Sequence, residues 1–201
     1  TSNIKSVIYA CQVSNMNIEI IDSKFNVNNY DGLIVPGIGS FNVVMNNLIS
    51  KNLDKNILDY LNKSKPAFFI CVGMQILFST SEEFGESKGL NYFKGKVKKI
   101  PEANDIKKRR IPLIGWNSIN IVKKTNIYND IDSKSNFYFT HSYYVDPDNK
   151  ELISSFSNYE NFKYCSSISK DNVFATQFHP EKSAETGLKM YNNFRNVCLS
   201  N

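Results

Sequence analysis

The chain has 201 residues, of which 41% are hydrophobic and 21% charged, a balance typical of a globular domain and not of a disordered chain. No apolar run approaches the roughly 18 residues that a membrane span requires, so we expect no membrane span. A formal net charge of +5 is too small to indicate a nucleic acid as a partner, although it permits a phosphorylated substrate or an acidic protein.

The cysteines are spread along the chain without the short spacings of a metal site. Scattered thiols of this kind are typical of proteins from reducing compartments, where disulfides are rare. We therefore expect a reduced, cytoplasmic protein that holds no metal, and we assign it no cofactor. The cysteines are Cys11, Cys71, Cys165 and Cys198.

The first part of the chain alternates helical and strand patterns. Apolar spacing predicts a helix over residues 4–11, strands over 17–22 and 33–35, and a helix over 41–49 that continues after a break over 57–61. The strand over 33–35 stops at Pro36 and Gly37, residues that commonly end such elements. This alternation favours a parallel sheet with helices on both faces.

A buried strand and a helix meet at Cys71. Residues 67–70 are wholly apolar, as in a strand covered on both faces, and apolar residues suited to a buried helix follow Gly73. A sharp turn at this point presents the cysteine above the sheet edge, where N–H groups at the helix start can stabilise a thiolate or an oxyanion. Taken alone, Cys71 is more simply a small hydrophobic residue of the core.

The second half of the chain consists mostly of predicted strands, followed by a closing helix on residues 184–198. Some of these strands are expected to pair antiparallel as an added smaller sheet. The predicted strands cover residues 97–100, 117–122, 136–144, 152–156, 162–168 and 173–178.

The last predicted strand ends in His179, and Glu181 follows two residues later. Side chains two apart on an extended chain share a face, so the carboxylate could hold the imidazole in one tautomer and stabilise its charged form. The simpler interpretation is that His179 caps the strand and Glu181 begins the last helix. With Cys71, these residues predict a Cys–His–Glu catalytic set. His141 has no carboxylate at matching spacing, and we give it no catalytic role.

These motifs resemble the class I glutamine amidotransferases, the triad-type glutaminases. Segments 35–41, 114–117 and 138–145 look like those of the glutaminase subunits of imidazole glycerol phosphate synthases, and the similarity covers nearly the whole chain. The resemblance implies one domain over residues 1–201, with an open, mostly parallel central sheet flanked by helices and an added smaller antiparallel sheet.

Two features depart from the family pattern. Phe69 stands where the family usually has a glycine, so its bulky side chain must find space near the turn. The family also has a strand before the helix that begins near Asn3, whereas this sequence starts at Thr1, so we expect the central sheet to lack a strand.

The resemblance implies hydrolysis of L-glutamine to glutamate and ammonia through a thioester on Cys71. His179 would transfer the protons and Glu181 would orient it. The oxyanion would be bound by the Val72 N–H and by the loop of Gly37, Ile38 and Gly39. Contacts to the amino-acid end of glutamine would come from Gln75, Ser142 and Tyr143, although Gln75 could instead be a solvent-facing helix residue.

The resemblance also implies a (β/α)₈-barrel cyclase subunit as partner in a heterodimer that makes imidazole glycerol phosphate in histidine biosynthesis. Trp116, Asn117 and Lys182 would face this partner, while core packing is an equally good interpretation of Trp116. The basic run at residues 107–110 is either a solvated loop or a contact for an acidic patch.

Three other functions stay open at this point. The chain could be a paralogous glutaminase that supplies ammonia to another pathway, such as sugar amidination. It could be a cysteine peptidase or γ-glutamyl hydrolase on the same fold, or a non-catalytic interaction subunit.

Overall fold

The computed structural model describes residues 2–37, 39–102 and 110–201, and the strands within these ranges form two sheets, one of seven strands and one of four. From edge to edge, the larger sheet holds β1 (Leu33–Pro36), β2 (Ala67–Ile70), β11 (Val173–Thr176), β10 (Phe162–Lys170), β9 (Ile153–Tyr159), β6 (Leu113–Ile121) and β7 (Asn136–His141). The smaller sheet holds β4 (Ser87–Lys88), β3 (Thr80–Ser81), β5 (Gly95–Lys99) and β8 (Tyr143–Pro147).

The larger sheet is mixed. Its strands pair parallel between β1 and β2 and between β2 and β11, and antiparallel from β11 through β10, β9 and β6 to β7. The predicted α/β fold with a smaller second sheet is confirmed, but the parallel part is limited to three strands. Short turns join β9 to β10 and β10 to β11, and consecutive strands joined in this way can pair only antiparallel. The smaller sheet also contains one parallel pair, β3 with β5.

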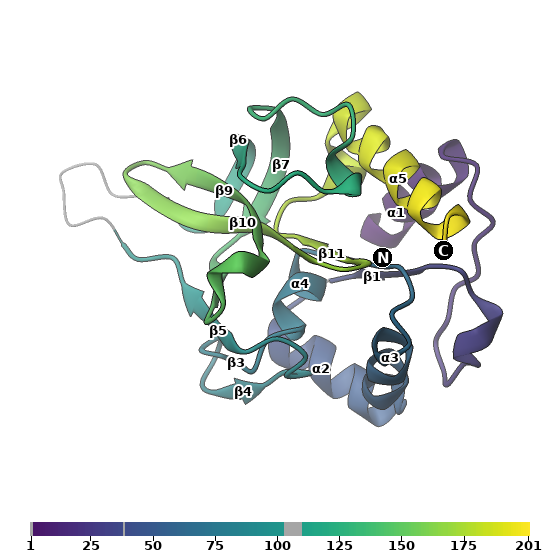
Figure 1. Cartoon of the computed structure of the whole chain (residues 1–201). Helices are drawn as coiled ribbons and strands as arrows, with labels where there is room; N and C mark the ends of the chain where they lie inside the picture. Colours follow the sequence, from purple (N-terminus) through teal and green to yellow (C-terminus); the bar gives the residue numbers. More distant parts are fainter. Residues whose placement is uncertain (1, 38, 103–109) are drawn as a thin grey trace.

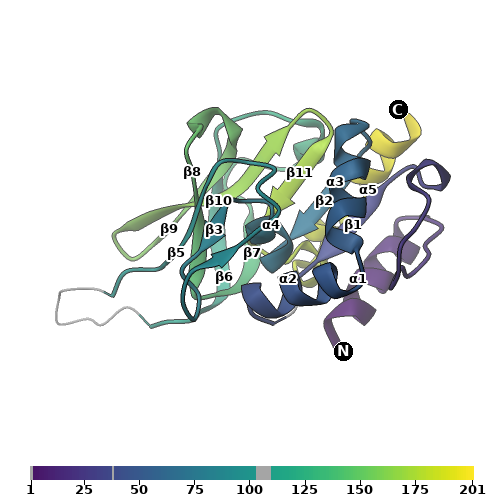
Figure 2. The same ribbon diagram turned by 90° about the horizontal axis from the view of Figure 1, so that it is seen from below.

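Helices cover both faces of the parallel part. Figure 1 shows α1 and α5 on one face of β1 and β11, and α2 and α3 on the other. Figure 2 shows the same helices gathered beside β1 and β2, with the β5, β6, β9 and β10 strands extending to the other side. In the part of the chain that the structure describes, no helix has the length and apolarity to cross a membrane. The helices are α1 (Ser2–Val13), α2 (Phe41–Ser50), α3 (Leu53–Asn62), α4 (Val72–Ile76) and α5 (Ala184–Leu199), with short 3₁₀ turns η1 (Val27–Asn29), η2 (Asn126–Tyr128), η3 (Lys150–Leu152) and η4 (Pro180–Lys182).

Two aromatic residues of β2 anchor this layered packing. Phe68 is fully buried and packs on α5, with its ring centre 5.9 Å from that of Tyr191 and 5.6 Å from that of Phe194. Phe69, which the resemblance sets in the place of a glycine, is also fully buried, and its neighbour in register on β11 is the small Ala175. The sheet therefore accommodates the bulky ring before the turn at Cys71.

Two strand predictions are corrected by the structure. Residues 17–22 join neither sheet, and Ile20 is 61% exposed. In the described residues β1 pairs only with β2, and Pro36 offers no N–H along the open edge of β1, which makes this edge a weaker partner for another strand. Residues 136–144 form two strands, β7 and β8, which separate at Ser142 and enter different sheets.

Candidate active site

The backbone turns sharply between β2 and α4 at Cys71. Cys71 has φ +56° and ψ −113°, a conformation that L residues rarely adopt, and it directly precedes α4. The turn is held from the neighbouring strand, because the N–H of Cys71 donates to the carbonyl of Thr176 at 2.7 Å. The predicted strand–cysteine–helix turn is confirmed, and such turns expose a nucleophile at a sheet edge.

Two glycines allow the loop after β1 to lie directly on this turn. A Cβ added to Gly37 would come within 2.3 Å of the Gly73 nitrogen, and one added to Gly73 would come within 2.2 Å of the Val35 carbonyl oxygen. No side chain fits at either position without moving backbone. The Gly37 N–H already donates to the Ile70 carbonyl at 2.9 Å, so this N–H is not available to bind an oxyanion.

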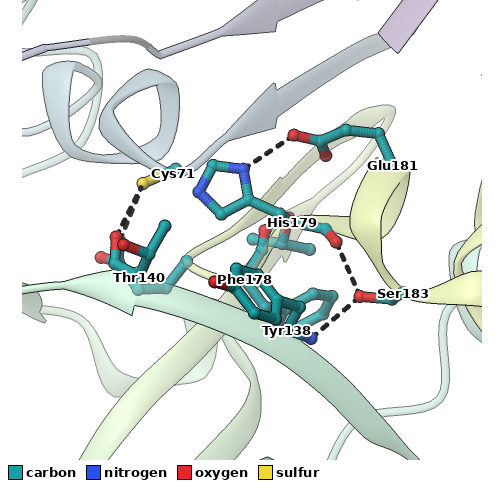
Figure 3. A network of polar contacts seen from close by, with 9 residues as sticks. Cys71, Tyr138, Thr140, Phe178, His179, Glu181 and Ser183 are labelled. Carbon is teal, nitrogen blue, oxygen red and sulfur yellow. Dashed lines mark hydrogen bonds and ion pairs between the residues drawn. The ribbon is translucent and has the colours of Figure 1, made fainter. Parts of the chain in front are cut away.

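His179 and Glu181 form a buried pair next to the turn. His179 Nδ1 lies 2.7 Å from Glu181 Oε1, and the two side chains are 3% and 1% exposed. The His179 backbone is fixed as well, because its N–H donates to the Tyr138 carbonyl at 2.8 Å and its carbonyl accepts the Ser183 hydroxyl at 2.6 Å. Figure 3 shows the imidazole between the carboxylate on one side and the sulfur of Cys71 on the other.

The free nitrogen of His179 faces the sulfur. Nε2 has no hydrogen-bond partner among the described residues, and Figure 3 shows it turned towards Cys71. Burial lowers the pKa of His179, but the neighbouring Cys71 sulfur and Glu181 carboxylate outweigh burial and raise this pKa from 6.5 to about 10. The imidazole is thus suited to accept and hold the thiol proton.

His141 lies in the same region with a different partner. Its Nδ1 is 2.8 Å from the Tyr143 carbonyl oxygen, which makes Nδ1 the protonated nitrogen. Burial lowers the pKa of His141 to about 4, although the bond to Tyr143 opposes the shift. His141 is therefore neutral near pH 7, and no carboxylate is bonded to it in the described ranges.

A cavity of about 290 Å³ opens over the turn. It brings together parts of the chain that are far apart in sequence, including Cys71, His179 and most of the predicted substrate-binding residues. Its walls are formed by Gly37, Gly39, Cys71, Val72, Gln75, Glu83, Pro112, Thr140, His141, Ser142, Tyr143 and His179.

The comparisons with known proteins agree with this geometry. A family model described as "Glutamine amidotransferase class-I" matches residues 1–197. This chain belongs to the class I glutamine amidotransferases. Two similar relatives are both described as "Imidazole glycerol phosphate synthase subunit HisH". The protein from Chlorobaculum tepidum is 37% identical over 96% of this chain and 94% of its own length. The protein from Pelagibacter ubique is 40% identical over 98% of this chain and 96% of its own length.

Solved structures support the same fold. One described as "Crystal structure of glutamine amidotransferase" matches with a TM-score of 0.72 at 13% identity, covering 96% of this chain and 93% of that one. A likeness at this identity concerns the fold alone.

Gln75 of this amidotransferase is buried and not solvent-facing. It is 3% exposed, and its Nε2 donates to the Tyr143 carbonyl and to Gln177 Oε1, both at 3.1 Å. Both amide hydrogens are thereby used, which leaves Oε1 to accept from a ligand. The solvent-facing interpretation of Gln75 is wrong.

Two polar residues at the site carry no sequence signal of their own. Glu83 lines the cavity and accepts the Phe41 N–H at the start of α2, at 2.7 Å, from 42 residues away. Gln177 is fully buried, and its Nε2 donates to Cys71 Sγ at 3.6 Å. Gln177 lies in the predicted strand over 173–178, one residue beyond the end of β11, and its position two residues before the histidine is the one hint that the sequence offers.

The residues predicted to face a partner behave differently from one another. Trp116 is 57% exposed, so core packing is wrong for it, and its ring stands edge-on to that of Tyr138 at 6.3 Å. Lys182 Nζ also contacts Tyr138, and it lies over that ring at 5.7 Å from the ring centre. Asn117 is instead bonded within the chain, with Nδ2 donating to the Asn158 carbonyl at 2.9 Å. Successive strand residues point to opposite faces, so Asn117 does not share the face of Trp116.

Two sequence predictions concern residues outside the described ranges. Ile38 of the predicted oxyanion loop lies outside them, as do residues 107–109 of the basic run. Among the described residues, no group of three or more His, Cys, Asp or Glu side chains could hold a metal ion.

Proposed function

We propose that this glutamine amidotransferase is the glutaminase subunit of an imidazole glycerol phosphate synthase. It hydrolyses L-glutamine to glutamate and ammonia, and the ammonia serves histidine biosynthesis. The observation that carries the proposal is that Cys71 and His179 line one cavity while Glu181 is bonded to the imidazole of His179. The relatives named HisH supply the pathway.

The reaction proceeds in two covalent steps. His179 Nε2 takes the thiol proton, and the Cys71 sulfur attacks the side-chain amide carbon of glutamine. The tetrahedral intermediate collapses when His179 returns the proton to the leaving nitrogen, which departs as ammonia and leaves a thioester. A water molecule then attacks the thioester carbonyl, giving its proton to His179, and glutamate leaves as the sulfur regains a proton. Throughout, Glu181 holds the imidazole by Nδ1 and stabilises its charged form.

The oxyanion of both tetrahedral intermediates lies near the start of α4. Val72 is the first residue of this helix and lines the cavity, and the first N–H groups of a helix have no partner within it. We assign the Val72 N–H as one donor. The loop of Gly37, Ile38 and Gly39 supplies the other, and because the Gly37 N–H is already bonded to Ile70, the second donor comes from a later residue of that loop. Loss of one such donor typically costs about 10²–10³ in turnover.

The cavity walls suit the amino-acid end of glutamine. The α-ammonium group would bind Gln75 Oε1 and the carboxylate of Glu83, which together offer neutral and charged acceptors. The α-carboxylate would bind at the backbone and hydroxyl of Ser142 and the backbone of Tyr143, which also line the cavity. Both ends of the substrate are then fixed while its amide lies over Cys71.

We place the partner on the surface formed by the exposed Trp116 and the half-buried Tyr138 and Lys182. The Tyr138 carbonyl holds the His179 N–H, so this surface lies directly behind the catalytic imidazole. An exposed tryptophan beside a tyrosine and a cation is the composition of an interface anchor. The partner is the (β/α)₈-barrel cyclase subunit, one per glutaminase, in a reducing compartment that keeps Cys71 a free thiol.

Replacing the nucleophile tests this function. Cys71→Ala in the complex with the cyclase subunit should abolish glutamine-dependent synthesis of imidazole glycerol phosphate, while synthesis from added ammonium salts continues. Cys165→Ala, which removes another buried thiol, should leave both activities in place. Persistence of glutamine-dependent synthesis in Cys71→Ala would overturn the proposal. A different barrel enzyme that accepts the ammonia would reassign the pathway.

A further inference from the structure

The amide of Gln177 lies against the sulfur of Cys71 in a fully buried position. Its Nε2 donates to Cys71 Sγ at 3.6 Å, and its Oε1 accepts from Gln75 Nε2 at 3.1 Å. The backbone of Gln177 is fixed by a bond from its N–H to the Ser166 carbonyl at 2.9 Å. The preceding residue, Thr176, accepts the N–H of Cys71. The end of β11 therefore holds both the turn and the amide that touches the sulfur.

Gln75 connects this buried amide to the cavity. Gln75 lines the cavity, and its second amide hydrogen bonds the carbonyl of Tyr143, another wall residue. Gln177 itself is not among the wall residues. A ligand that binds Gln75 thus acts on a group only one hydrogen bond away from the amide that contacts the nucleophile.

The two contacts of the sulfur favour different protonation states. The Thr140 carbonyl oxygen, 3.9 Å from Sγ, can accept only from a protonated thiol. The Gln177 N–H donates, so it can bind a thiol or a thiolate, and hydrogen bonds to ionised acceptors are about twice as strong as neutral ones. Gln177 therefore stabilises the sulfur in the form that attacks.

We propose that Gln177 is a positioning residue that holds the Cys71 sulfur as the attacking thiolate and links it through Gln75 to bound glutamine. Gln177 has this role only if Cys71 is the nucleophile of the proposed function. The catalytic groups remain Cys71 and His179, and Gln177 acts through the sulfur.

The decisive variant is Gln177→Met, which keeps the length and burial of the side chain but removes the N–H donor. Its matched control is Asn56→Leu. Asn56 is another buried amide with two hydrogen bonds, both to the backbone of Phe25, and it lines a different cavity. Thermal unfolding of both variants shows how much of any effect is general loss of stability.

Two measurements separate positioning from packing. The first is the kcat and KM for glutamine. The second is the rate at which iodoacetamide alkylates Cys71, followed by mass spectrometry of its peptide from pH 5 to 10, because only the thiolate reacts. The other titratable groups around the sulfur are His179 just before η4, Glu181 in η4, His141 on β7, Tyr143 on β8 and Glu83 on the cavity wall. All of these groups are unchanged in both variants. A shift in the pH midpoint of alkylation in Gln177→Met therefore reports the loss of the Gln177 amide.

For Gln177→Met we expect kcat to fall about tenfold to hundredfold, the range for loss of a hydrogen bond to a charged group, with a smaller change in KM. The pH midpoint of alkylation should rise by about one unit, and Asn56→Leu should keep the wild-type kcat and midpoint. A wild-type midpoint and kcat in folded Gln177→Met would overturn the proposal.

If Gln177→Met does not fold, Gln177→Glu decides the question, since it has the same shape with an oxygen in place of the donor. Its carboxylate should raise the midpoint at least as far, and an unchanged midpoint would again overturn the role of Gln177. The alkylation assay needs neither glutamine nor a partner. Wild-type protein that is alkylated at Cys71 but hydrolyses no glutamine with its cyclase would therefore contradict the proposed function alone.

Discussion

The two histidines of the chain line one cavity, yet their surroundings give them opposite charge preferences. The Nδ1 of His179 faces a buried carboxylate, and the pKa of His179 is raised to about 10. The Nδ1 of His141 faces a backbone carbonyl, and the pKa of His141 is lowered to about 4. A carbonyl can fix a tautomer but does not compensate a buried positive charge, whereas a carboxylate can. Burial lowers the pKa of both imidazoles, and only at His179 do the neighbouring Cys71 sulfur and Glu181 carboxylate outweigh it, so His179 is the histidine suited to serve as a base that carries a proton.

The largest effect should come from making His179 resemble His141. Glu181→Gln keeps the shape of the side chain but replaces the charge with a neutral amide. We expect glutaminase kcat to fall by about 10²–10⁴, because the imidazolium formed during the reaction loses its counter-charge and the tautomer is no longer fixed. Steady-state kinetics of the complex measure the loss. Glu185→Gln, an exposed carboxylate at the start of α5, should be fully active, and turnover of Glu181→Gln within threefold of wild type would contradict the comparison.

An intermediate effect should appear in the pH dependence of stability. His141 has a lowered pKa in the folded state, so its contribution is present above 6.5, the pKa of the unfolded chain, and is lost as the pH falls towards 4. His179 has a raised pKa, so its contribution is fully present below 6.5 and is lost as the pH rises through about 10. Mild acid therefore removes only the contribution of His141.

Urea unfolding at pH 7 and pH 5 measures this difference. Between these pH values, wild type should lose about 2 kcal/mol more than His141→Gln, from one pKa unit being worth about 1.4 kcal/mol. Glu181→Gln should be at least as sensitive to acid as wild type, because it leaves His141 in place and removes a group that raises the pKa of the buried His179. Equal losses in wild type and His141→Gln would show that His141 is not buried in its neutral form.

The smallest effect should come from loosening the link between the two histidine-bearing segments. The Ser183 hydroxyl donates to the His179 carbonyl at 2.6 Å and accepts the Tyr138 N–H at 2.9 Å, which fastens His179 to β7, the strand of His141. Ser183→Ala should cost about 1 kcal/mol of unfolding free energy, as for a typical buried hydrogen bond. Turnover should fall less than tenfold, since the bond from the His179 N–H to Tyr138 remains.

Ser50→Ala removes a comparable hydroxyl-to-carbonyl bond at the exposed end of α2, and it should change neither turnover nor stability by a comparable amount. A loss of turnover in Ser183→Ala as large as that of Glu181→Gln would mean that backbone placement, more than the carboxylate, sets the role of His179.

Most of the secondary structure follows from local pattern. Apolar spacing predicts the positions of the helices α1, α2 and α5 and of the strands β1, β2 and β11. An element that is buried on one face or on both has apolar residues at regular intervals, and these intervals can be seen in the sequence. The predicted strand at 17–22 is wrong because a local pattern alone does not make a strand. Alternation describes a possible strand, but a strand also needs a neighbour with free backbone groups, and neighbours are not a local property.

The same division applies to the site. His179 and Glu181 are predictable because two residues of extended chain suffice to bring their side chains together, and Cys71 is predictable because strand, turn and helix follow one another without interruption. Gln177 is 106 residues away in sequence from the cysteine whose sulfur it contacts, and Glu83 is 42 residues away from Phe41 at the start of α2. The residues next to Gln177 and Glu83 in the sequence therefore do not predict these contacts.

By itself, then, the amino-acid order determined most of the strands and helices and pointed to the side chains that we propose for the reaction, since both depend on residues close together along the backbone. Only the packed sheets decided that Phe69 has room, that Gln75 and Gln177 meet, and that the pKa of one histidine is raised and that of the other lowered. These outcomes depend on burial and on contacts between residues that are far apart in the sequence. Both arise only when the sheets and helices pack together.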